Sequence, residues 1–523
     1  MRKKMKRWLL STVALTCLLG WLVPPLESAS DKPKRGGTLT MGIRKDLTHM
    51  NVLVQTRSTD QSIRDLMFEP LLGDDLKGNI QPNLAETWDI SNDGKVYTFR
   101  LRKGVRFHNG EEMTVEDVKF AMDYTMNPAN GAYGYTNLTI VERVEAVDKH
   151  TLKVYLKRPS PAFLTSLTNI QSFSVIPKGS LRGGVEKPAV FPPGTGPFKF
   201  VDWKPQQQIV LERYNDYWGQ KAYVDRLILR PIGSATVRFT ALRAGDVDIA
   251  EDTPREWVKQ ILEGKIKGVS YVAAPHAGLR LVRFNVAAPP FDNKKLRQAI
   301  AYAIDKKEIL HAAYFGFGEV SDQRYPKGHA WYIEGVPSYS YNPEKAKALL
   351  TEAGYVGQPL EILTENLDVT EAEATALQAQ LKRIGINVKV KILEAGSYTE
   401  VARRGEFEIR PGGGSFDDDP SVTYTPQLAC EQDLKKRMNN LSGYCNKEMN
   451  ALLEKAAAEL NLEKRRALFK QILGKMLDDV PEIYLGFVPR FFATREFVKN
   501  FTTNSDGGFR WWGGGMNHAW LDR

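Results

Sequence analysis

GTGPFKFVDWKPQQQIVLERYNDYW, residues 194–218, is the stretch of this sequence that decides its fold. Glycine and proline at residues 194–197 interrupt any regular element there. After them, apolar and polar side chains alternate over residues 198–203 and again over 208–214, which is the pattern of half-buried strands. The stretch therefore predicts a turn that leads into two β-strands.

Upstream of this stretch, the sequence carries more strand pattern and one well-marked helix start. Residues 97–102 alternate in the manner of a half-buried antiparallel strand. Thr114 followed by Asp117 is a capping-box pattern, which predicts that a helix begins there. Further strands are expected at residues 38–43, 139–147 and 151–156, and a helix at 60–68. Residues 66–189 are thereby predicted to form a small α+β unit.

Downstream of the stretch, helical periodicity becomes dominant. A helix at residues 235–244 is predicted to end at Gly245, because glycine is common just after a helix end. Asn293 is a candidate N-cap for a helix whose apolar side chains, residues 296–304, share one face. Further helices are expected at 341–354, 369–384, 446–459 and 462–479, and strands at 279–286, 360–363, 386–393 and 483–488. Such alternation predicts an α/β domain.

Length and composition place the chain among globular proteins with more than one domain. It has 523 residues, of which 42% are hydrophobic and 10% aromatic, enough for two or three cores. The formal charge is +10 and falls to +6 without residues 1–30. The remaining lysines and arginines are mixed with acidic residues, as on a solvated surface, so no nucleic-acid partner is expected.

Residues 1–30 have the layout of a secretory signal peptide. Five basic residues precede an apolar run at residues 8–23, and small residues follow at 28–30. The run is short for a membrane span, which needs about 20 residues, and an uncleaved N-terminal anchor is the alternative. We therefore expect an exported protein that works outside the cytoplasm, in the periplasm or an equivalent compartment.

Two cysteines, Cys430 and Cys445, remain outside the predicted signal peptide. An even pair in an oxidising compartment is more typical of a disulfide than of a metal site or a nucleophile. Closing a loop of this length contributes about 3 kcal/mol in the chain-entropy account. We expect a disulfide between Cys430 and Cys445, with two unpaired thiols as the alternative.

The sequence contains no constellation that indicates catalysis. Its seven histidines are scattered, Ser415 lies in no Gly-x-Ser-x-Gly turn, and no His-Glu-x-x-His segment occurs. The consecutive acids at residues 417–419 lack the alternate spacing of a calcium loop. We therefore expect no enzyme, no metal site and no cofactor, with a secreted hydrolase as the alternative function.

The stretch at residues 194–218 resembles a block of family 5 of the bacterial solute-binding proteins, the peptide, nickel and opine type. The letters GTGPF, the tryptophan at 203, LER at 211–213 and YW at 217–218 match that block in order. Similar blocks follow the family order at residues 84–88 with 93–101, 107–110 with 116–118, 297–300 with 303–305, 342–346 and 353–355. The resemblance covers nearly the whole chain after residue 30.

The resemblance implies an α/β fold with two lobes, the type II periplasmic-binding-protein fold of cluster C, with an additional small α+β subdomain. Lobe I would comprise residues 31–65, 190–280 and 490–523, the inserted subdomain 66–189, and lobe II 281–489. The chain would then cross between the lobes twice, near residues 279–285 and 484–490.

The same resemblance implies a binding function. Members of the family hold a small ligand between two lobes that close around it about a hinge. The chain is accordingly expected to capture a peptide-like or other small polar solute, as a monomer, and to deliver it to an ABC permease and its ATPase. A solute sensor or a chaperone on the same fold is the alternative.

A glycine-rich, acidic loop in lobe II is the first candidate for ligand contact. In peptide-binding relatives the corresponding loop carries an aspartate that neutralises the ammonium group of the ligand. Counting back from Asp419-Pro420 without gaps puts Phe416 at that position, with Asp417 as the nearest acid. Phe416 and Asp417 are therefore candidate ligand-binding residues. The alternative is a surface loop in which Asp419 caps a turn before Pro420.

Aromatic side chains are the other candidates, because binding clefts use large apolar faces with a few polar anchors. Trp511 and Trp512 lie among glycines near the C-terminus, and Tyr133 and Tyr135 lie among glycines in the inserted unit. Tyr398 comes shortly before the lobe II loop. For each of these five aromatic residues, a role in packing is the alternative to ligand contact.

Overall fold

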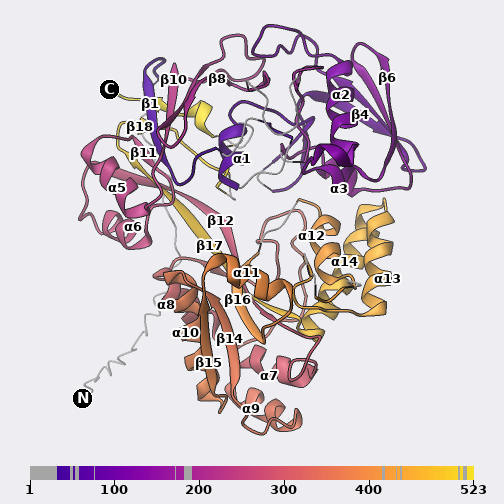
Figure 1. The fold of residues 1–523 in the computed structure, drawn as a ribbon, viewed down its shortest axis with the longest axis vertical. Coiled ribbons are helices and arrows are strands. Elements are labelled where there is room, and N and C mark those ends of the chain that lie inside the picture. The colour runs from indigo at the N-terminus through magenta and orange to yellow at the C-terminus, as the bar shows by residue number, and fades with distance from the viewer. Residues whose placement is uncertain are drawn as a thin grey trace, which may run out of the picture.

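The computed structural model describes residues 32–523 with short gaps, and Figure 1 shows two bodies joined by long strands. The residues left out inside this range are 48–50, 54–57, 76, 171, 182–190, 415–417, 431–432, 436, 438, 505–506 and 510–514. The predicted signal peptide at residues 1–30 lies outside the described residues. In the described part of the chain, no helix combines the length and the apolar character that a bilayer span requires.

One 11-stranded sheet runs through both bodies in the order β15-β14-β16-β12-β17-β11-β1-β10-β9-β8, with β13 paired to β17. The strands are β1 (Thr38–Ile43), β8 (Phe198–Lys204), β9 (Gln208–Arg213), β10 (Arg226–Pro231), β11 (Ile249–Ala250), β12 (Val269–Phe284), β13 (Glu319–Val320), β14 (Leu360–Glu365), β15 (Val388–Leu393), β16 (Ile409–Gly414) and β17 (Glu482–Arg495). We call the body around β1 and β8 to β11 lobe I, and the body around β14 to β16 lobe II.

The stretch at residues 194–218 forms the predicted turn and strand pair. Gly196 N donates to the Met67 carbonyl at 2.9 Å, and a Cβ on Gly196 would lie only 2.7 Å from the carbonyl carbon of Met67. His108 closes the turn: Nδ1 accepts from Gly194 N at 3.3 Å, and Nε2 donates to the Gly196 carbonyl at 3.0 Å. Glycine is required at 196 because a side chain there would clash with backbone.

Lobe I buries its sheet beneath short helices. These are α1 (Ser58–Arg64), α5 (Ala235–Ala244) and α6 (Arg255–Leu262). Its core includes Leu39, Ile209 and Phe492. The Ser234 hydroxyl accepts from the backbone at the start of α5, and Gly245, with a φ of 92°, ends the helix as the sequence predicts.

A separate antiparallel sheet, ordered β4-β5-β7-β6, forms the small unit inserted in lobe I. Its elements are β2 (Leu72–Asp74), β3 (Ile80–Pro82), β4 (Ala85–Ile90), β5 (Val96–Leu101), α2 (Val115–Met126), α3 (Tyr135–Leu138), β6 (Val141–Asp148), β7 (Thr151–Leu156) and α4 (Ala162–Thr165). The Asp117 carboxylate accepts from the Thr114 backbone at 2.8 Å and from its hydroxyl at 2.9 Å, so α2 begins where the sequence predicts. Tyr97, Phe99 and Phe163 pack in a core of its own.

Lobe II surrounds its strands with helices. These are α7 (Lys294–Ala303), α8 (Lys306–Tyr314), α9 (Pro343–Glu352), α10 (Asp368–Arg383), α11 (Ala395–Arg403), α12 (Pro420–Leu428), α13 (Lys447–Ala458) and α14 (Leu462–Asp479). One core includes Ile300 and Ile362, and a second core includes Phe469. A disulfide with an S–S distance of 2.02 Å joins Cys430 to Cys445, between α12 and α13.

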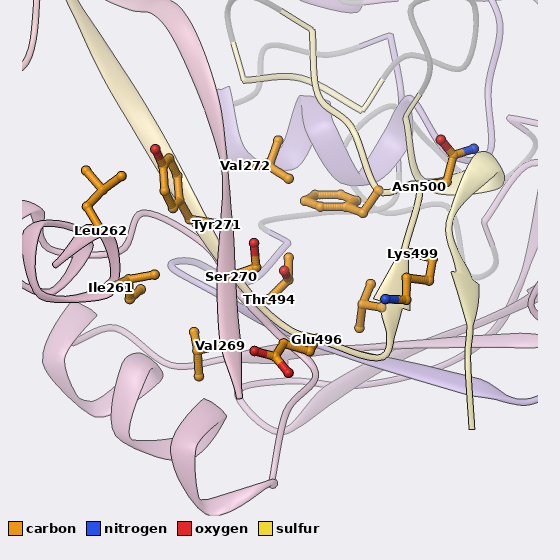
Figure 2. A pocket seen from close by; sticks show the side chains of 12 residues that line it. Ile261, Leu262, Val269, Ser270, Tyr271, Val272, Thr494, Glu496, Lys499 and Asn500 are labelled. Carbon is orange, nitrogen blue, oxygen red and sulfur yellow. The ribbon is translucent and has the colours of Figure 1, made fainter. Parts of the chain in front are cut away.

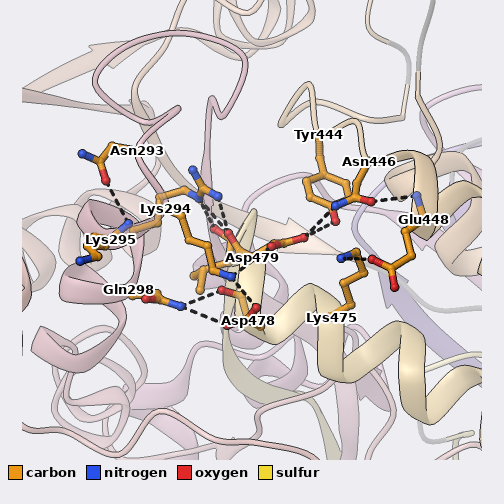
Figure 3. Close-up of polar contacts among 12 residues, drawn as sticks. Asn293, Lys294, Lys295, Gln298, Tyr444, Asn446, Glu448, Lys475, Asp478 and Asp479 are labelled. Atoms are coloured by element: carbon orange, nitrogen blue, oxygen red, sulfur yellow. Dashed lines mark hydrogen bonds and ion pairs between the residues drawn. The ribbon is translucent and has the colours of Figure 1, made fainter.

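Polar contacts tie α7 to the C-terminal end of α14 and to the loop before α13 (Figure 3). Arg297 donates from Nε to the Asp479 carbonyl at 2.9 Å. The Asp479 carboxylate accepts from the Tyr444 hydroxyl at 2.6 Å, and Lys294 pairs with Asp478. Carbonyls at a helix end lack partners within the helix, so Arg297 satisfies one of them. The contacts thus hold the disulfide segment against the helices of lobe II.

Candidate functional site

The strands β12 and β17 cross from lobe I to lobe II and pair with each other on both sides of the crossing (Figure 1). Their register shifts between Ala274 and Gly278, so residues 275–277 bulge out of the ladder. Pro275 lies in this bulge and Pro489 lies opposite it, and neither has an N–H to donate. A bulge with a proline on each strand interrupts the ladder, so the pair bends most easily there.

On one side of the crossing, α6 of lobe I touches α8 of lobe II. The guanidinium carbon of Arg255 lies 4.8 Å from the centre of the Tyr314 ring, and Nη2 donates to the Pro489 carbonyl at 3.2 Å. In the bulge itself, the His276 ring packs edge-on against Phe487 with 5.2 Å between centroids. The crossing is therefore braced by aromatic and cationic side chains from both lobes.

On the other side, the inserted unit of lobe I touches lobe II. Ala330 N donates to the Lys77 carbonyl at 2.8 Å. Next to this hydrogen bond, Gly78, with a φ of 78°, lies against the ring of His329. A Cβ on Gly78 would sit 2.6 Å from Cε1 of that ring, closer than real contacts allow. We call these four residues the latch.

The inserted unit touches lobe II a second time, at the turn between β4 and β5. A Cβ on Gly94 would lie 2.6 Å from Cδ1 of Leu460, which follows α13. Leu460 is nevertheless 43% exposed, so this contact lies at the rim. Contacts therefore flank the crossing on both sides, and the structure has its lobes closed together.

Three consecutive glycines, residues 412–414, end β16 beside the crossing. The last of them pairs with Leu279 of β12, which follows the bulge. The middle glycine is exposed, so this end of the strand presents backbone without side chains. The candidates in the next loop and near the C-terminus lie outside the described residues: Phe416, Asp417, Trp511 and Trp512.

Asp419 is the N-cap of α12. Its Oδ1 accepts from Ser421 N at 2.8 Å, and its two oxygens pair with the Nη atoms of Arg465 at 2.6 and 2.7 Å. The alternative predicted for the loop had Asp419 cap a turn on the surface before Pro420; the structure instead has a buried Asp419 that caps a helix beginning at Pro420. Asp418 Oδ1 lies 3.9 Å from Nε2 of His329, so the loop ends close to the latch.

A row of charged side chains crosses β16, β12 and β17. Arg410 lies directly opposite Arg283, which lies opposite Glu482. The Glu482 carboxylate is shared, with Oε2 3.1 Å from Arg283 Nε and Oε1 2.7 Å from Arg324 Nη2. Burial by itself raises the pKa of Glu482, but Arg324 and Arg283 overcome this effect and hold it at about 2. One ionised carboxylate therefore forms ion pairs with two guanidinium groups.

Arg410 is the member of the row that does not pair with Glu482. Within the described part of the chain, its side chain makes no hydrogen bond and no ion pair, and its Nε is buried. Its guanidinium carbon lies 4.3 Å from the centre of the Tyr398 ring. Burial, with the nearby charge of Arg283 as a smaller cause, lowers the pKa of Arg410 to about 10.

The structure places the described candidates in different parts of the molecule. Tyr398, on α11, is 4% exposed, and its hydroxyl donates to the Pro411 carbonyl at 2.9 Å, as in a packed residue. Tyr133 and Tyr135 lie in the inserted unit, just before and at the start of α3, and Tyr133 is 41% exposed. Tyr398 meets Arg410 but neither of these tyrosines. Ligand contact by all three stays a prediction.

Sequence reasoning missed the charged row and the latch. A signal for the row was present, because Arg280 and Arg283 interrupt the otherwise apolar segment LRLVRF at residues 279–284. Arginines in a buried strand need partners, so they mark a polar site inside the lobe. The latch joins loops that are far apart in the sequence, and no local pattern marks Lys77 or Ala330.

A groove of about 630 Å³ lies on lobe I, between α6, the start of β12 and the chain after β17 (Figure 2). Leu262 and Tyr271 line it, with Glu496 and Lys499 among its polar residues. Every residue that lines it belongs to lobe I. A ligand held there would not bridge the lobes and so would not favour their closed state. The junction of the two lobes, where β12 and β17 cross, is the better candidate site, because a ligand there could contact both lobes.

Comparison with known proteins agrees with this geometry. The family profile "Bacterial extracellular solute-binding proteins, family 5 Middle" matches residues 79–435. Heme-binding protein A of Haemophilus influenzae is 32% identical over 467 residues, which cover 81% of this chain and 82% of that protein. The dipeptide-binding protein of Escherichia coli is 29% identical over 452 residues, covering 81% and 84%. The glutathione-binding protein GsiB of Pectobacterium atrosepticum is 28% identical over 490 residues, covering 92% of each chain.

Solved structures show the same architecture. The ABC transporter substrate-binding protein CtaP of Listeria monocytogenes has a TM-score of 0.84 and 26% identity, covering 94% of this chain and 100% of that one. The periplasmic binding protein DppA of Helicobacter pylori, in complex with the peptide STSA, has a TM-score of 0.76 and 27% identity, covering 94% and 99%. These similarities confirm the predicted resemblance and the predicted two-lobe α/β fold class. The chain belongs to family 5 of the bacterial extracellular solute-binding proteins.

Proposed function

We propose that this protein is the solute-binding component of an ABC importer. It captures a peptide-like or other small polar solute between its lobes and delivers it to a membrane permease and its ATPase. The observation that carries the proposal is the closed pair of lobes, with contacts at Arg255 on one side of the crossing strands and at Lys77 on the other. Family membership supports it, since the similar proteins are named for binding heme, dipeptides and glutathione.

Closure links binding to transport in this proposal. A solute favours the closed state only if it makes better contacts with both lobes when they are together. The hydrogen bond from Ala330 to Lys77 contributes about 0.5–1.5 kcal/mol. A micromolar solute supplies about −8 kcal/mol, part of which offsets the ordering of the lobes. The bound solute, more than the latch, therefore decides which state is populated.

The proposal includes export and work outside the cytoplasm as a monomer. Residues 1–30 would act as the signal peptide. The bond between Cys430 and Cys445 supports an oxidising compartment, where disulfides persist. We also propose the division into lobe I, the inserted unit and lobe II at residues 31–65, 190–280 and 490–523, at 66–189, and at 281–489.

We further propose that the protein does not alter its solute chemically. The family and its solved neighbours are binding proteins. No group of three or more His, Cys, Asp or Glu residues is placed to hold a metal ion in the described part of the chain. A secreted hydrolase would instead turn over a chromogenic ester or peptide. A sensor or chaperone would bind the solute without supporting its uptake.

A thermal-shift screen of the exported protein tests the proposed function. The panel contains dipeptides, oligopeptides, glutathione, heme, opines, oligosaccharides and nickel chelates. A solute at 100 times its dissociation constant should stabilise the protein by about 2.7 kcal/mol. Small-angle scattering should then give a smaller radius of gyration with the solute than without it. No shift with any member of the panel, or turnover of the probes, would contradict the proposal.

A further inference from the structure

The crossing strand β12 has an open edge in lobe I. In lobe II this strand lies between β16 and β17, whereas its residues 269–274 in lobe I pair with β17 alone. Unpaired backbone at the edge of a sheet is a template on which another extended chain can add as a strand. The edge at residues 269–274, which we call the open edge, is therefore a candidate binding surface apart from the junction of the lobes.

The hydrogen-bond pattern of β12 identifies the backbone groups that face the open edge. Glu496 N donates to the Gly268 carbonyl at 3.2 Å, and in an antiparallel ladder every second residue is bonded to the partner strand. Residues 270, 272 and 274 therefore bond to β17, and the N–H and C=O groups of Val269, Tyr271 and Ala273 point the other way. Among the described residues, none of these six groups has a hydrogen-bond partner.

Both outermost strands of the same sheet are protected against strand addition, whereas the open edge is not. β8, FKFVDWK, carries three charged side chains and a register shift between Phe200 and Asp202. β15, VKVKIL, carries Lys389 and Lys391, and both are exposed. Charged residues, lysine in particular, and bulges keep edge strands from pairing with other chains. The open edge, VSYVAA, has no charged residue, and only Pro275, which follows it, limits the length that can pair.

The groove in Figure 2 runs along the open edge. Four consecutive residues, 269–272, line it. Because their side chains alternate between the two faces of the strand, the groove follows the edge of the strand and not one face. Leu262 of α6, which is 48% exposed, and Phe501 add apolar walls. A groove of about 630 Å³ with such walls suits an extended segment whose side chains alternate.

The segments that border the groove are basic. Residues 259–268, which lead into β12, and residues 495–500, at the end of β17 and after it, carry five basic side chains and two acidic ones: Lys259, Lys265, Lys267, Arg495 and Lys499 against Glu263 and Glu496. Such a field attracts an acidic partner and repels a basic one. A second copy of this chain would bring the same basic segments to the interface, so the charges disfavour self-pairing.

We propose that the open edge binds an extended acidic segment of a partner protein by strand addition. The backbone of the partner would pair with Val269, Tyr271 and Ala273, and its acidic side chains would lie beside the lysines that border the groove. The open edge belongs to lobe I alone, so binding there does not require the lobes to close. The protein thus has a second binding surface, for a polypeptide and not for a solute, and this proposal does not rest on the proposed function.

Two synthetic heptapeptides with acetylated and amidated ends test the proposal on the whole exported protein. The acidic probe is Glu-Val-Glu-Val-Glu-Val-Glu, and the basic probe has lysine in place of each glutamate. Isothermal titration calorimetry measures affinity, and hydrogen exchange with mass spectrometry locates the bound peptide. Ala273→Pro removes one N–H group from the open edge, whereas Ala273→Ser keeps it. Lys267→Glu combined with Lys499→Glu reverses two charges beside the groove.

The acidic probe should slow hydrogen exchange at up to three amides of residues 268–274, those of Val269, Tyr271 and Ala273, and should bind more tightly than the basic probe. Ala273→Pro should bind the acidic probe about tenfold more weakly than Ala273→Ser, because one backbone hydrogen bond is lost. Proline is tolerated there, since the N–H group of residue 273 faces away from β17. The double variant of Lys267 and Lys499 should reverse the preference between the probes, and it tests the proposal even if Ala273→Pro lowers the thermal midpoint.

Four results would overturn the proposal. One is unchanged exchange at residues 268–274 with the acidic probe, and another is equal affinity of Ala273→Pro and Ala273→Ser for it. Protection at residues 409–414 and 484–490 instead would place the peptide at the junction of the lobes. Protection of the open edge without any peptide, together with a dimer in sedimentation, would make a second copy of the chain the occupant. The thermal-shift screen for solutes is separate, so the proposed function can stand whichever result is found.

Discussion

His329 leaves no room for a side chain on Gly78, since a Cβ on this glycine would lie 2.6 Å from Cε1 of the imidazole. The two residues belong to different lobes, and the hydrogen bond between Ala330 N and the Lys77 carbonyl holds their loops together at 2.8 Å. The fit between glycine and imidazole exists only while the lobes are closed. It therefore offers a way to change closure without touching the bound solute.

Gly78→Ala should shift the protein toward open lobes. The added Cβ would meet the His329 ring in the closed state, whereas the open state would separate the two loops. We expect a larger radius of gyration with solute bound and a lower affinity, by about tenfold, for whichever solute the screen identifies, from a penalty of about 1–2 kcal/mol. Small-angle scattering and calorimetry measure the two effects.

Gly110→Ala is the matched control for this change. Gly110 has a φ of 87°, close to the 78° of Gly78, but a Cβ on it would meet no atom within 4 Å. Both variants carry the cost of an alanine at positive φ, about 1 kcal/mol or more. Only Gly78→Ala should affect closure, and equal affinities of the two variants would rule out the latch as the cause.

Glu482→Gln should destabilise lobe II strongly. The change leaves Arg283 and Arg324 without their shared carboxylate, and breaking a buried pair in this way costs about 3–5 kcal/mol. Urea unfolding at pH 7 measures the loss. Glu406→Gln, which breaks an exposed pair with Arg404, should leave the unfolding curve nearly unchanged.

The same carboxylate sets an acid limit on stability. The folded-state pKa of Glu482, about 2, lies below its ordinary value of 4.5. Its stabilisation is therefore complete above pH 4.5 and is lost as the pH falls toward 2. The difference in unfolding free energy between wild type and Glu482→Gln should narrow as the pH falls from 4.5 toward 2. A difference that stays constant would show that the carboxylate is not ionised in the folded state.

His108 should add a second pH dependence at higher pH. Burial lowers its pKa to about 4 from an ordinary value of 6.5, so the unfolded chain gains a proton below pH 6.5 that the folded chain does not. Unfolding free energy should fall by about 1.4 kcal/mol per pH unit from this residue between pH 6.5 and 4. His108→Gln should remove this component, because glutamine keeps a donor and an acceptor without titrating. If the unfolding free energies of the wild type and of His108→Gln depend on pH in the same way, the prediction is contradicted.

Removing the disulfide should destabilise the protein by about 3 kcal/mol, through the loop that it closes. The double variant Cys430→Ser, Cys445→Ser should unfold at a lower guanidinium concentration than the oxidised wild type. Treatment with a reductant should bring the wild type to the curve of the variant and should leave the variant unchanged. If the reductant also destabilises the variant, its effect on stability has a cause other than the loss of this disulfide.

Much of the secondary structure could be predicted because its signals are local. Thr114 with Asp117 opens α2, Asn293 caps α7, and Gly245 ends α5. Where the prediction of secondary structure failed, contacts with residues far away in the sequence determined the structure. The helix expected at residues 60–68 ends at Arg64 and is followed by turns at 65–67, where the carbonyls of Leu66 and Met67 accept from Phe198 N and Gly196 N of a distant segment.

The crossing strands and the charged row show why the rest could not be predicted. β12 and β17 are longer than expected, since Pro275 and Pro489 are typical of strand ends and a bulge accommodates them only in the folded sheet. The position of Arg410 opposite Arg283 depends on strand register, which the pattern of one strand does not specify. Tyr398 could be proposed as a candidate from the sequence, but its burial beneath β16 could not be predicted from it.

One sheet runs through both lobes, and its ladder is interrupted between them at residues 275–277, so this segment can act as a pivot. β12 and β17 stay paired above and below residues 275–277, so the two halves cannot slide past each other and can only tilt about that short segment. Displacement in a tilt grows with distance from its pivot. Gly94 and Leu460, out at the rim, would then move farther than Leu279 beside the bulge, so a tilt at the proline pair would open the rim first.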